Sequence, residues 1–287
     1  MDASPPLTKR RPNVKLCAAM AVAAMLSVQT GAAVSTWMFG SLGPVGAAFS
    51  RLALAALILL LFVRPDFRSI SWEALLSAAG LGVVSAAMTL CYFQAIDRIP
   101  LGTASTLEYL GPFAVAVFGL RRSYDVIWPV LALLGVVLLT SPWSGSLDLA
   151  GIGFGLAAGA SLAGYVLLSQ RVGDGFSGLQ GLAVSLAVAA VVSGFFGVGD
   201  VVAGFSVPVL LTSVLAALLL PLLPYALEMQ ALRGMRASSF ATLMSFEPGF
   251  ACIIGFLLLG QHLALLQIAG IALVVIAGIG AVRRGER

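Results

Sequence analysis

The sequence predicts an all-α membrane protein of ten transmembrane helices, arranged as two inverted-topology repeats of five helices each. Three observations predict this fold: an apolar composition, ten apolar segments and a duplicated pattern of polar residues. Of the 287 residues, 60% are hydrophobic and only 10% are charged, and the mean hydropathy is +1.05. A soluble domain has about 25% charged residues. The chain therefore lacks a water-facing surface, and lipid is its expected solvent.

Ten apolar segments remain when the chain is divided at charges, prolines and turn residues. A bilayer core is about 30 Å thick, which takes roughly 20 helical residues to cross. The segments, of which the fifth is short, are 16–37, 42–63, 74–96, 101–120, 125–141, 149–169, 177–198, 207–231, 237–259 and 263–282. Only a few residues join them, so no domain is expected outside the membrane beyond a polar, basic N-terminal tail, 1–15. A cleaved signal peptide over 9–28 is disfavoured, because the apolar run continues to Phe39.

The positions of the basic residues predict the orientation, because cytoplasmic loops of membrane proteins are enriched in Lys and Arg. With a cytoplasmic N-terminus, Arg98 falls on the outer face and Arg51 lies inside a span. All other basic residues fall on the inner side: Lys9, Arg10, Arg11, Lys15, Arg64, Arg68, Arg121, Arg122, Arg171, Arg233, Arg236, Arg283, Arg284 and Arg287. This distribution supports ten spans independently. It predicts that both termini are cytoplasmic and that 144–148 lies on the outer face.

Two stretches 136 residues apart repeat the same pattern. Gln94, Ala95, Thr106, Leu107 and Pro112 fall on Gln230, Ala231, Thr242, Leu243 and Pro248. A weaker similarity relates the first and sixth spans, where Ser27 and Ser35 fall on Ser161 and Ser169. The repeats are therefore 16–142 and 149–287, and an odd number of crossings inverts the second copy. Inverted repeats with polar breaks near mid-depth favour a secondary transporter with alternating access over a merely enlarged bundle.

Two charged residues lie deep inside the predicted spans of the first half. Arg51, in the second span, cannot deprotonate and needs an acid, carbonyl groups or water. Pairing with Glu108 or Glu247 is the economical solution, and a permanent ion pair that fixes helix packing is an equal alternative. Glu108 and the adjacent Tyr109 lie in the fourth span, shortly before Pro112, which is expected to kink the helix. We expect Arg51, Glu108 and Tyr109 to bind substrate.

The second half adds a tyrosine, a carboxylate and three prolines. Tyr165 lies at the middle of the sixth span, away from the membrane interfaces where tyrosine is common. Glu247 lies about 11 residues into the ninth span, or roughly 16 Å at 1.5 Å per residue, near the bilayer centre. A carboxylate there costs several kcal/mol unless it is protonated, paired or hydrated. We expect Tyr165 and Glu247 to bind substrate, and Pro221, Pro224 and Pro248 to form kinks or hinges.

The motifs of common enzymes do not occur in the chain. It has no phosphate-binding glycine loop, no His-Glu metal pair and no Gly-x-Ser-x-Gly elbow, so we expect neither an enzyme nor a cofactor or metal site. The net charge of +4 does not predict nucleic-acid binding, because the basic residues lie at loop ends. Without a nucleotide site, a gradient must supply the energy. A carboxylate that alternates between protonated and charged forms, Glu247 or else Glu108, would couple transport to protons.

These residues resemble those of a known family. Ten spans in two halves, Arg51 in the second span and Glu247-Pro248 in the ninth resemble EamA-type members of the drug/metabolite transporter superfamily, over nearly the whole chain. The run 107–116 followed by Arg121-Arg122, together with Tyr225-Ala226-Leu227-Glu228, is similar to the threonine/homoserine exporter branch. The resemblance implies a bacterial inner-membrane exporter of amino acids or related small metabolites, working by proton antiport.

Two alternatives remain open. A drug or nucleoside exporter of the same superfamily would have a cavity rich in aromatic side chains. A non-transporting membrane scaffold or lipid-modification subunit would need none of Arg51, Glu108 and Glu247. Glu228 is close in sequence to Arg233, which favours a partnership at the inner rim over a role at mid-depth. The pattern predicts no particular oligomeric state.

Overall fold

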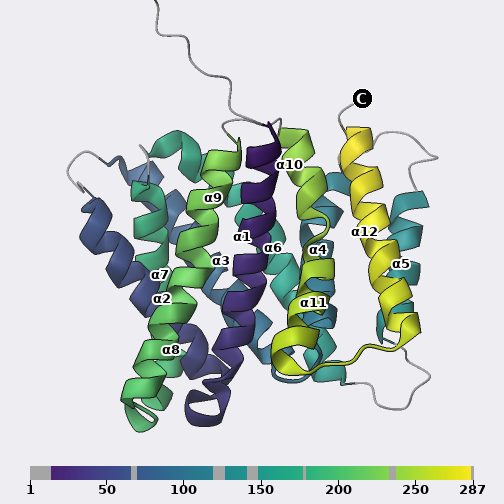
Figure 1. Cartoon of the computed structure of the whole chain (residues 1–287). Coiled ribbons are helices and arrows are strands. Elements are labelled where there is room, and N and C mark those ends of the chain that lie inside the picture. Colours follow the sequence, from purple (N-terminus) through teal and green to yellow (C-terminus); the bar gives the residue numbers. More distant parts are fainter. Residues whose placement is uncertain are drawn as a thin grey trace, which may run out of the picture.

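Every regular element in the part of the chain that the structure describes is a helix. The computed structural model describes residues 14–65, 70–118, 127–140, 148–176, 179–232 and 237–285. The elements are α1 (Val14–Thr36), α2 (Phe39–Val63), α3 (Trp72–Ile96), α4 (Leu101–Phe118), α5 (Ile127–Thr140), α6 (Leu149–Gly175), α7 (Gln180–Ala203), α8 (Val207–Ala217), η3 (Leu218–Leu222), α9 (Leu223–Leu232), α10 (Ala237–Met244), α11 (Glu247–Leu259) and α12 (Leu265–Gly285). They form one bundle in which α1 begins and α12 ends at the same end (Figure 1). The predicted all-helical class is confirmed over these residues.

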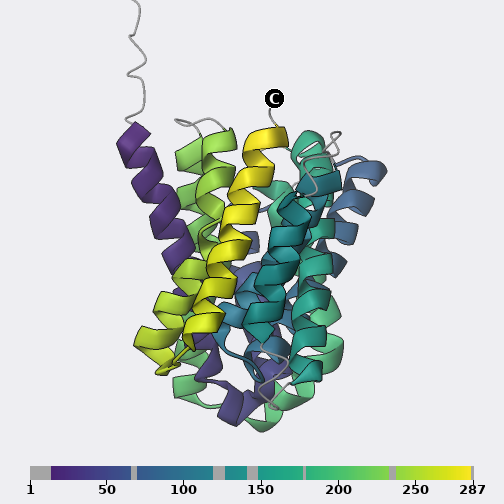
Figure 2. The same ribbon diagram turned by 90° about the vertical axis from the view of Figure 1, so that its right-hand side faces the viewer.

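Within the described residues, seven helical segments are long and apolar enough to cross a membrane. They are Lys15–Thr36, Phe39–Val63, Trp72–Ile96, Leu149–Gly173, Gln180–Ala203, Val207–Leu232 and Thr242–Leu259. These correspond to seven of the ten predicted spans, and α4, α5 and α12 correspond to the other three. Helices α5 and α12 pack side by side at one edge of the bundle (Figure 2). The seven segments show a multi-pass membrane protein, and the count of ten stays a prediction.

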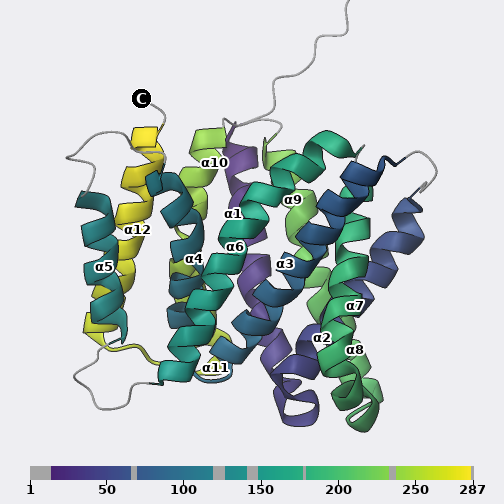
Figure 3. The same cartoon turned by 180° about the vertical axis from the view of Figure 1, so that it is seen from behind.

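Apart from Arg51, which lies inside α2, the described basic residues lie near the two ends of the bundle. Lys15, Arg64, Arg171 and Arg283 lie near the start of α1 and the ends of α2, α6 and α12, which share one end, whereas Arg98 follows α3 at the other end (Figure 3). The remaining residues used to predict the orientation lie outside the described residues: 1–13, Arg68, Arg121, Arg122, 141–147, Arg233, Arg236 and Arg287. Helix α1 begins at the end where Lys15 lies, and α6 begins at the opposite end (Figures 1 and 3).

Small residues allow the helices to approach closely inside the bundle, while large apolar side chains cover its outside. A Cβ on Gly111 of α4 would lie 1.8 Å from the carbonyl oxygen of Gly159 of α6, so only glycine fits there. Close backbone approach of this kind is typical of helix packing in lipid. In contrast, Phe62, Phe195 and Leu265 are all more than 80% exposed. The bundle is thus suited to an apolar solvent on its outer surface.

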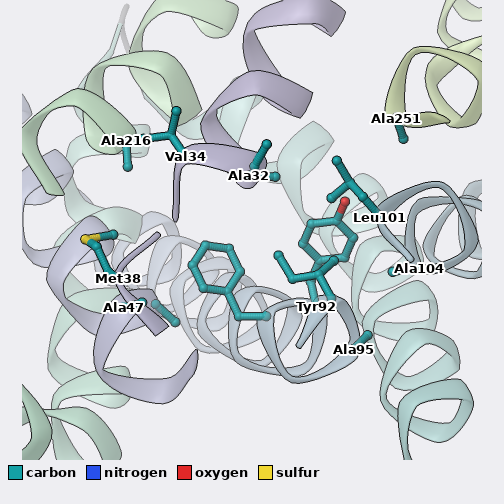
Figure 4. Packing of buried hydrophobic residues seen from close by; sticks show 14 of the residues in the cluster. Ala32, Val34, Met38, Ala47, Tyr92, Ala95, Leu101, Ala104, Ala216 and Ala251 are labelled. Atoms are coloured by element: carbon teal, nitrogen blue, oxygen red, sulfur yellow. The ribbon is translucent and has the colours of Figure 1, made fainter. Parts of the chain in front are cut away.

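A tightly packed apolar cluster fills the end of the bundle opposite to the start of α1. It consists mostly of small and medium side chains, with Tyr92 and Phe93, that come from the second half of α1, the start of α2, the end of α3, the start of α4, α6, α8 and α11. Figure 4 shows its members Ala32, Val34, Met38, Ala47, Tyr92, Ala95, Leu101, Ala104, Ala216 and Ala251. Phe93 is fully buried in this cluster. The cluster closes the bundle at this end.

Two of the long apolar segments are broken within the bundle. In the segment of α8, η3 and α9, the backbone of Leu220 leaves the helical region, with φ −156° and ψ 112°. The Leu220 carbonyl has no helical donor four residues on, because Pro224 has no N–H. The neighbouring carbonyl of Leu219 accepts a hydrogen bond of 2.7 Å from Ser27 Oγ of α1. The second break separates α10 from α11, immediately before Glu247.

Candidate functional site

A cavity of about 670 Å³ lies among α1, α2, α3, α4, α6, α7, η3, α9, α10, α11 and α12. It extends from the middle of the bundle toward the end at which α7 and α10 begin, since Leu182 and Phe240 line it within the first turn of those helices. The apolar cluster closes the opposite end. The polar side chains of the lining are those of Gln29, Arg51, Ser85, Thr89, Tyr92, Glu108, Tyr109, Tyr165, Ser185, Tyr225, Glu228 and Ser245.

Arg51 is the one cationic side chain among the described residues that line the cavity. Its Nη1 donates to the free carbonyl oxygen of Leu220 at 3.0 Å, and its Nη2 donates to Thr89 Oγ1 of α3 at 3.0 Å. The guanidinium carbon also lies 5.1 Å from the centre of the Phe93 ring. The guanidinium therefore links the non-helical backbone of η3 to α3 through one hydrogen bond to each.

The predicted ion pair of Arg51 with Glu108 or Glu247 is not formed, although all three residues are described. No carboxylate oxygen of either glutamate lies within 4.0 Å of Arg51; the ion pair found in the described chain joins Arg98 and Asp97 at the closed end. The physical reason is the break at Leu220, which supplies a free carbonyl oxygen that satisfies one arm of the guanidinium. Arg51 and Glu108 still interact electrostatically across the cavity.

Glu108 lies on the wall of this cavity without a fixed partner. Its carboxylate makes no hydrogen bond and no ion pair with any other described residue, and the side chain is 9% exposed. Pro112, four residues on, deprives the backbone carbonyl of Glu108 of its helical donor, although α4 continues through Pro112. Gly159 of α6 packs directly against this carbonyl, where a Cβ would approach to 2.9 Å. Glu108 is therefore free to bind a ligand's cationic group.

Glu247 lies behind the cavity wall at the start of α11. Its side chain is 0% exposed, and its Oε1 accepts a hydrogen bond of 3.0 Å from Nε2 of Gln29 on α1. Its Oε2 is buried and has no hydrogen-bond partner among the described residues. The Tyr109 side chain is close enough to interact with this carboxyl without forming a bond of good geometry.

The structure brings most of the predicted site residues to one cavity. Arg51, Glu108, Tyr109 and Tyr165 line it, and so do the prolines predicted as kinks, Pro112, Pro221, Pro224 and Pro248. Glu247 differs, because it reaches the cavity through Gln29 rather than directly. Among the described residues, no group of three or more His, Cys, Asp or Glu side chains has the arrangement of a metal site.

Sequence reasoning missed Gln29 and did not include Glu228 among the site residues. Gln29 is a polar residue deep within the first apolar segment, and that position is the signal that would have found it. Glu228 lines the cavity from α9 and interacts electrostatically with Tyr165. The partner expected for it at the inner rim, Arg233, lies outside the described residues. The cavity therefore has a second carboxylate besides Glu108.

Comparison with known proteins identifies relatives over nearly the whole chain. A model of the EamA-like transporter family matches residues 15–141 and, a second time, residues 149–283. The threonine/homoserine exporter RhtA of Salmonella typhimurium (strain LT2) is 37% identical over 262 residues, which cover 90% of this chain and 88% of the relative. The threonine/homoserine exporter RhtA of Escherichia coli (strain K12) is 35% identical over 280 residues, or 96% and 94% of the two chains.

Two further comparisons are weaker: one covers only part of the chain, and the other has a low sequence identity. The pseudopaline exporter CntI of Pseudomonas aeruginosa is 33% identical over 102 residues, which cover 33% of this chain and 36% of the relative. One solved crystal structure superposes with a TM-score of 0.62 at 17% identity and covers 94% of this chain and 99% of the other. This last likeness shows a shared fold alone.

Proposed function

Because the chain belongs to the EamA-like transporter family and is a multi-pass bacterial membrane exporter, we propose that it exports threonine- or homoserine-like amino acids across the inner membrane by proton antiport. The kinship with two threonine/homoserine exporters along most of the chain supports a small substrate that bears both charges. The remaining alternative of a non-transporting scaffold is disfavoured by the same kinship.

The observation that carries this proposal is the pair of opposite charges on the cavity wall. Arg51 and Glu108 face the same cavity and interact across it without direct contact. An amino acid has a carboxylate and an ammonium group, so its site near mid-depth must offer both signs. In the proposed complex the ammonium group binds Glu108, and the substrate carboxylate binds near Arg51. Tyr109 and Tyr165 complete this site.

Alternating access between two inverted repeats is proposed on three grounds. The family model matches the chain twice, and α1 and α6 begin at opposite ends of the bundle. Both broken segments pass the cavity, as expected of discontinuous helices in secondary transporters. We take 16–142 and 149–287 as the repeats and Pro112, Pro221, Pro224 and Pro248 as the places where the helices bend.

The orientation we propose puts both termini in the cytoplasm. The concentration of described basic residues at the end where α1 begins supports it, because positive charge is retained on the cytoplasmic side. The cavity extends toward that same end. The structure then corresponds to an inward-facing state, in which an exporter loads its substrate. Protons entering from outside would drive substrate release.

A flux assay with the purified protein in liposomes tests the proposed function. We expect efflux of threonine or homoserine well above that of protein-free liposomes, and faster efflux when a pH gradient drives protons in the opposite direction. The panel should include neutral, acidic, basic and aromatic amino acids at equal concentration. If no α-amino acid in the panel moves, the proposed substrate class is wrong.

A second candidate is the export of a larger metabolite with an aromatic or extended apolar part. The cavity wall is rich in aromatic side chains, Tyr92, Tyr109, Phe113, Tyr165, Tyr225 and Phe240. A volume of about 670 Å³ also lies in the range of pockets for drug-sized ligands, roughly 300–1,000 Å³. Competition in the same flux assay separates the candidates: inhibition by aromatic metabolites at lower concentrations than by threonine favours this one.

Replacement of Glu228 by glutamine tests whether the second carboxylate of the cavity contributes to substrate binding. We expect KM for export to rise about fivefold with little change in kcat, since a partly exposed charge pair contributes up to about 1 kcal/mol. The matched control is Glu73→Gln, which removes an exposed carboxylate at the start of α3. Equal KM values for the two variants and the wild type would contradict the prediction.

A further inference from the structure

Gln29 stands between the buried Glu247 and the cavity. Its Nε2 donates to Glu247 Oε1 at 3.0 Å and to Ser105 Oγ at 3.4 Å, and its Oε1 accepts from the Tyr92 hydroxyl at 3.5 Å. Gln29 and Tyr92 line the cavity, whereas Glu247 does not and is 0% exposed. The Gln29 amide therefore joins the Glu247 carboxyl to the lining of the cavity.

The counterpart of the Gln29–Glu247 pair, at the contact between α4 and α6, is built without polar side chains. The alignment that superimposes Ser27 on Ser161 also places Gln29 on Ala163, and the offset of 136 residues places Glu247 on Gly111. Gly111 and Ala163 are in contact: a Cβ on Gly111 would lie 3.2 Å from the backbone nitrogen of Ala163. Close backbone packing thus suffices to join α4 to α6. The Gln29–Glu247 pair between α1 and α11 is not needed for packing alone.

The chemistry of an amide next to a carboxyl group makes the pair sensitive to a proton. When Glu247 is ionised, its Oε1 is an acceptor that suits the Nε2 donor of Gln29. A proton on Oε2 would be a buried donor without a hydrogen bond of good geometry to any described residue, which costs about 1–3 kcal/mol. A proton on Oε1 can instead be donated to Gln29 Oε1, which requires the amide to turn by a half rotation. Gln29 then presents Nε2 to Tyr92, and the Tyr92 hydroxyl must accept instead of donate.

We propose that Gln29 is the positioning residue that transmits the protonation state of Glu247 to the cavity, by reversing the hydrogen bond to Tyr92. This inference rests on the proposed proton antiport and assigns its coupling step to the seam between α1 and α11. The titratable groups that face Glu247 from the neighbouring helices are Glu108 and Tyr109 on α4, Glu228 on α9 and Tyr92 on α3. Only Gln29 forms a hydrogen bond with it among the described residues.

The test compares two kinds of transport in liposomes. Substrate exchange without a pH gradient requires only binding and the change of access, whereas gradient-driven net efflux also requires coupling. In Gln29→Met, which keeps the length of the side chain but removes the amide, we expect the stimulation by a pH gradient to fall about tenfold, within the usual range for coupling between sites. Exchange should remain at nearly the wild-type rate. The pH profile of exchange should flatten as well.

Two controls and a second variant make the test decisive. Ser105→Ala removes the second hydrogen bond that Gln29 Nε2 donates and should leave gradient stimulation unchanged. Gln29→Asn keeps an amide but is one methylene group too short for the 3.0 Å contact, so it should lose coupling as Gln29→Met does. Wild-type stimulation in both Gln29 variants overturns the inference, as does an equal loss of exchange and of gradient-driven efflux. A wild-type protein that exchanges substrate but ignores the gradient refutes the proposed antiport itself.

Discussion

Replacement of Arg51 by lysine should lower the rate of substrate export at least tenfold while the protein remains folded in the membrane. The guanidinium joins two helices at once, with one arm on the Leu220 carbonyl of η3 and the other on Thr89 of α3. A lysine ammonium is a single point charge and cannot reproduce this planar fork. One of the two contacts is then lost, and with it the geometry of the charge that we propose to receive the substrate carboxylate.

The expected size of the effect follows from the buried hydrogen bonds. A hydrogen bond to a charged group contributes about 1.5–3 kcal/mol, and about 1.4 kcal/mol corresponds to a tenfold change in an equilibrium. Arg51→Ala should be more severe, because it removes a side chain that is only 4% exposed and leaves the Leu220 carbonyl without its donor. We expect no measurable export from the alanine variant.

A matched control separates the loss of the fork from a general sensitivity to arginine replacement. Arg98 also donates to a backbone carbonyl, that of Gln94 at 3.0 Å, and pairs with Asp97, but it lies at the closed end away from the cavity. Arg98→Lys should export at the wild-type rate. The measurement is substrate flux at equal protein content in liposomes. Wild-type flux from Arg51→Ala would show that Arg51 does not belong to the substrate site.

The sequence predicted the helices well because the bilayer imposes a simple rule on them. Seven predicted spans coincide with helices of membrane length, and the boundaries differ by only a few residues since charged and turn residues end the apolar runs. One helix break lies next to prolines at which the sequence predicts a kink. Leu220, where η3 departs from helical geometry, immediately precedes Pro221 and lies four residues before Pro224, and proline removes a backbone donor. Helix α4, in contrast, continues through Pro112.

The partners of the charged residues could not be predicted in the same way. Opposite charges in an apolar sequence suggest an ion pair, and this expectation for Arg51 was wrong. The actual acceptor is the backbone carbonyl of Leu220, which becomes free only because the distant segment η3 is broken and packs beside α1 and α2. A backbone acceptor of this kind cannot be recognised from the residue type, because tertiary packing alone creates it.

The position of Glu247 illustrates the same limit. Sequence spacing placed it near mid-depth but did not tell whether its carboxylate faces the cavity or the helix packing. In the structure it lies behind Gln29, on the seam of α1 and α11, while Glu108 takes the place on the cavity wall. The two glutamates occupy similar but inequivalent places in their spans, because Gly111 rather than a carboxylate stands opposite Glu247 in the repeat. Their roles therefore differ: we propose Glu108 as the ammonium ligand and Glu247 as the main proton site.

Replacement of Glu247 by glutamine should abolish the response of export to a pH gradient. Burial of a charged carboxylate deep in a membrane protein costs several kcal/mol unless it is paired, and the single bond to Gln29 at 3.0 Å is the pairing that the structure provides. A group in such a place is able to be neutral in one state of the cycle and charged in another. Glutamine has the shape of the neutral acid but cannot release a proton, so it holds the protein in the protonated condition.

The decisive measurement is substrate efflux from liposomes with and without an imposed pH gradient, for the wild type and Glu247→Gln at equal protein content. We expect the wild type to respond strongly and the variant not at all, while substrate exchange without a gradient persists in the variant because Glu108 still faces the cavity. Glu108→Gln is the matched control: it should impair exchange and net efflux alike, since it removes the proposed ligand of the ammonium group. Equal stimulation of Glu247→Gln and the wild type by the gradient would show that another group couples transport to protons, and Glu108 would then be the next candidate.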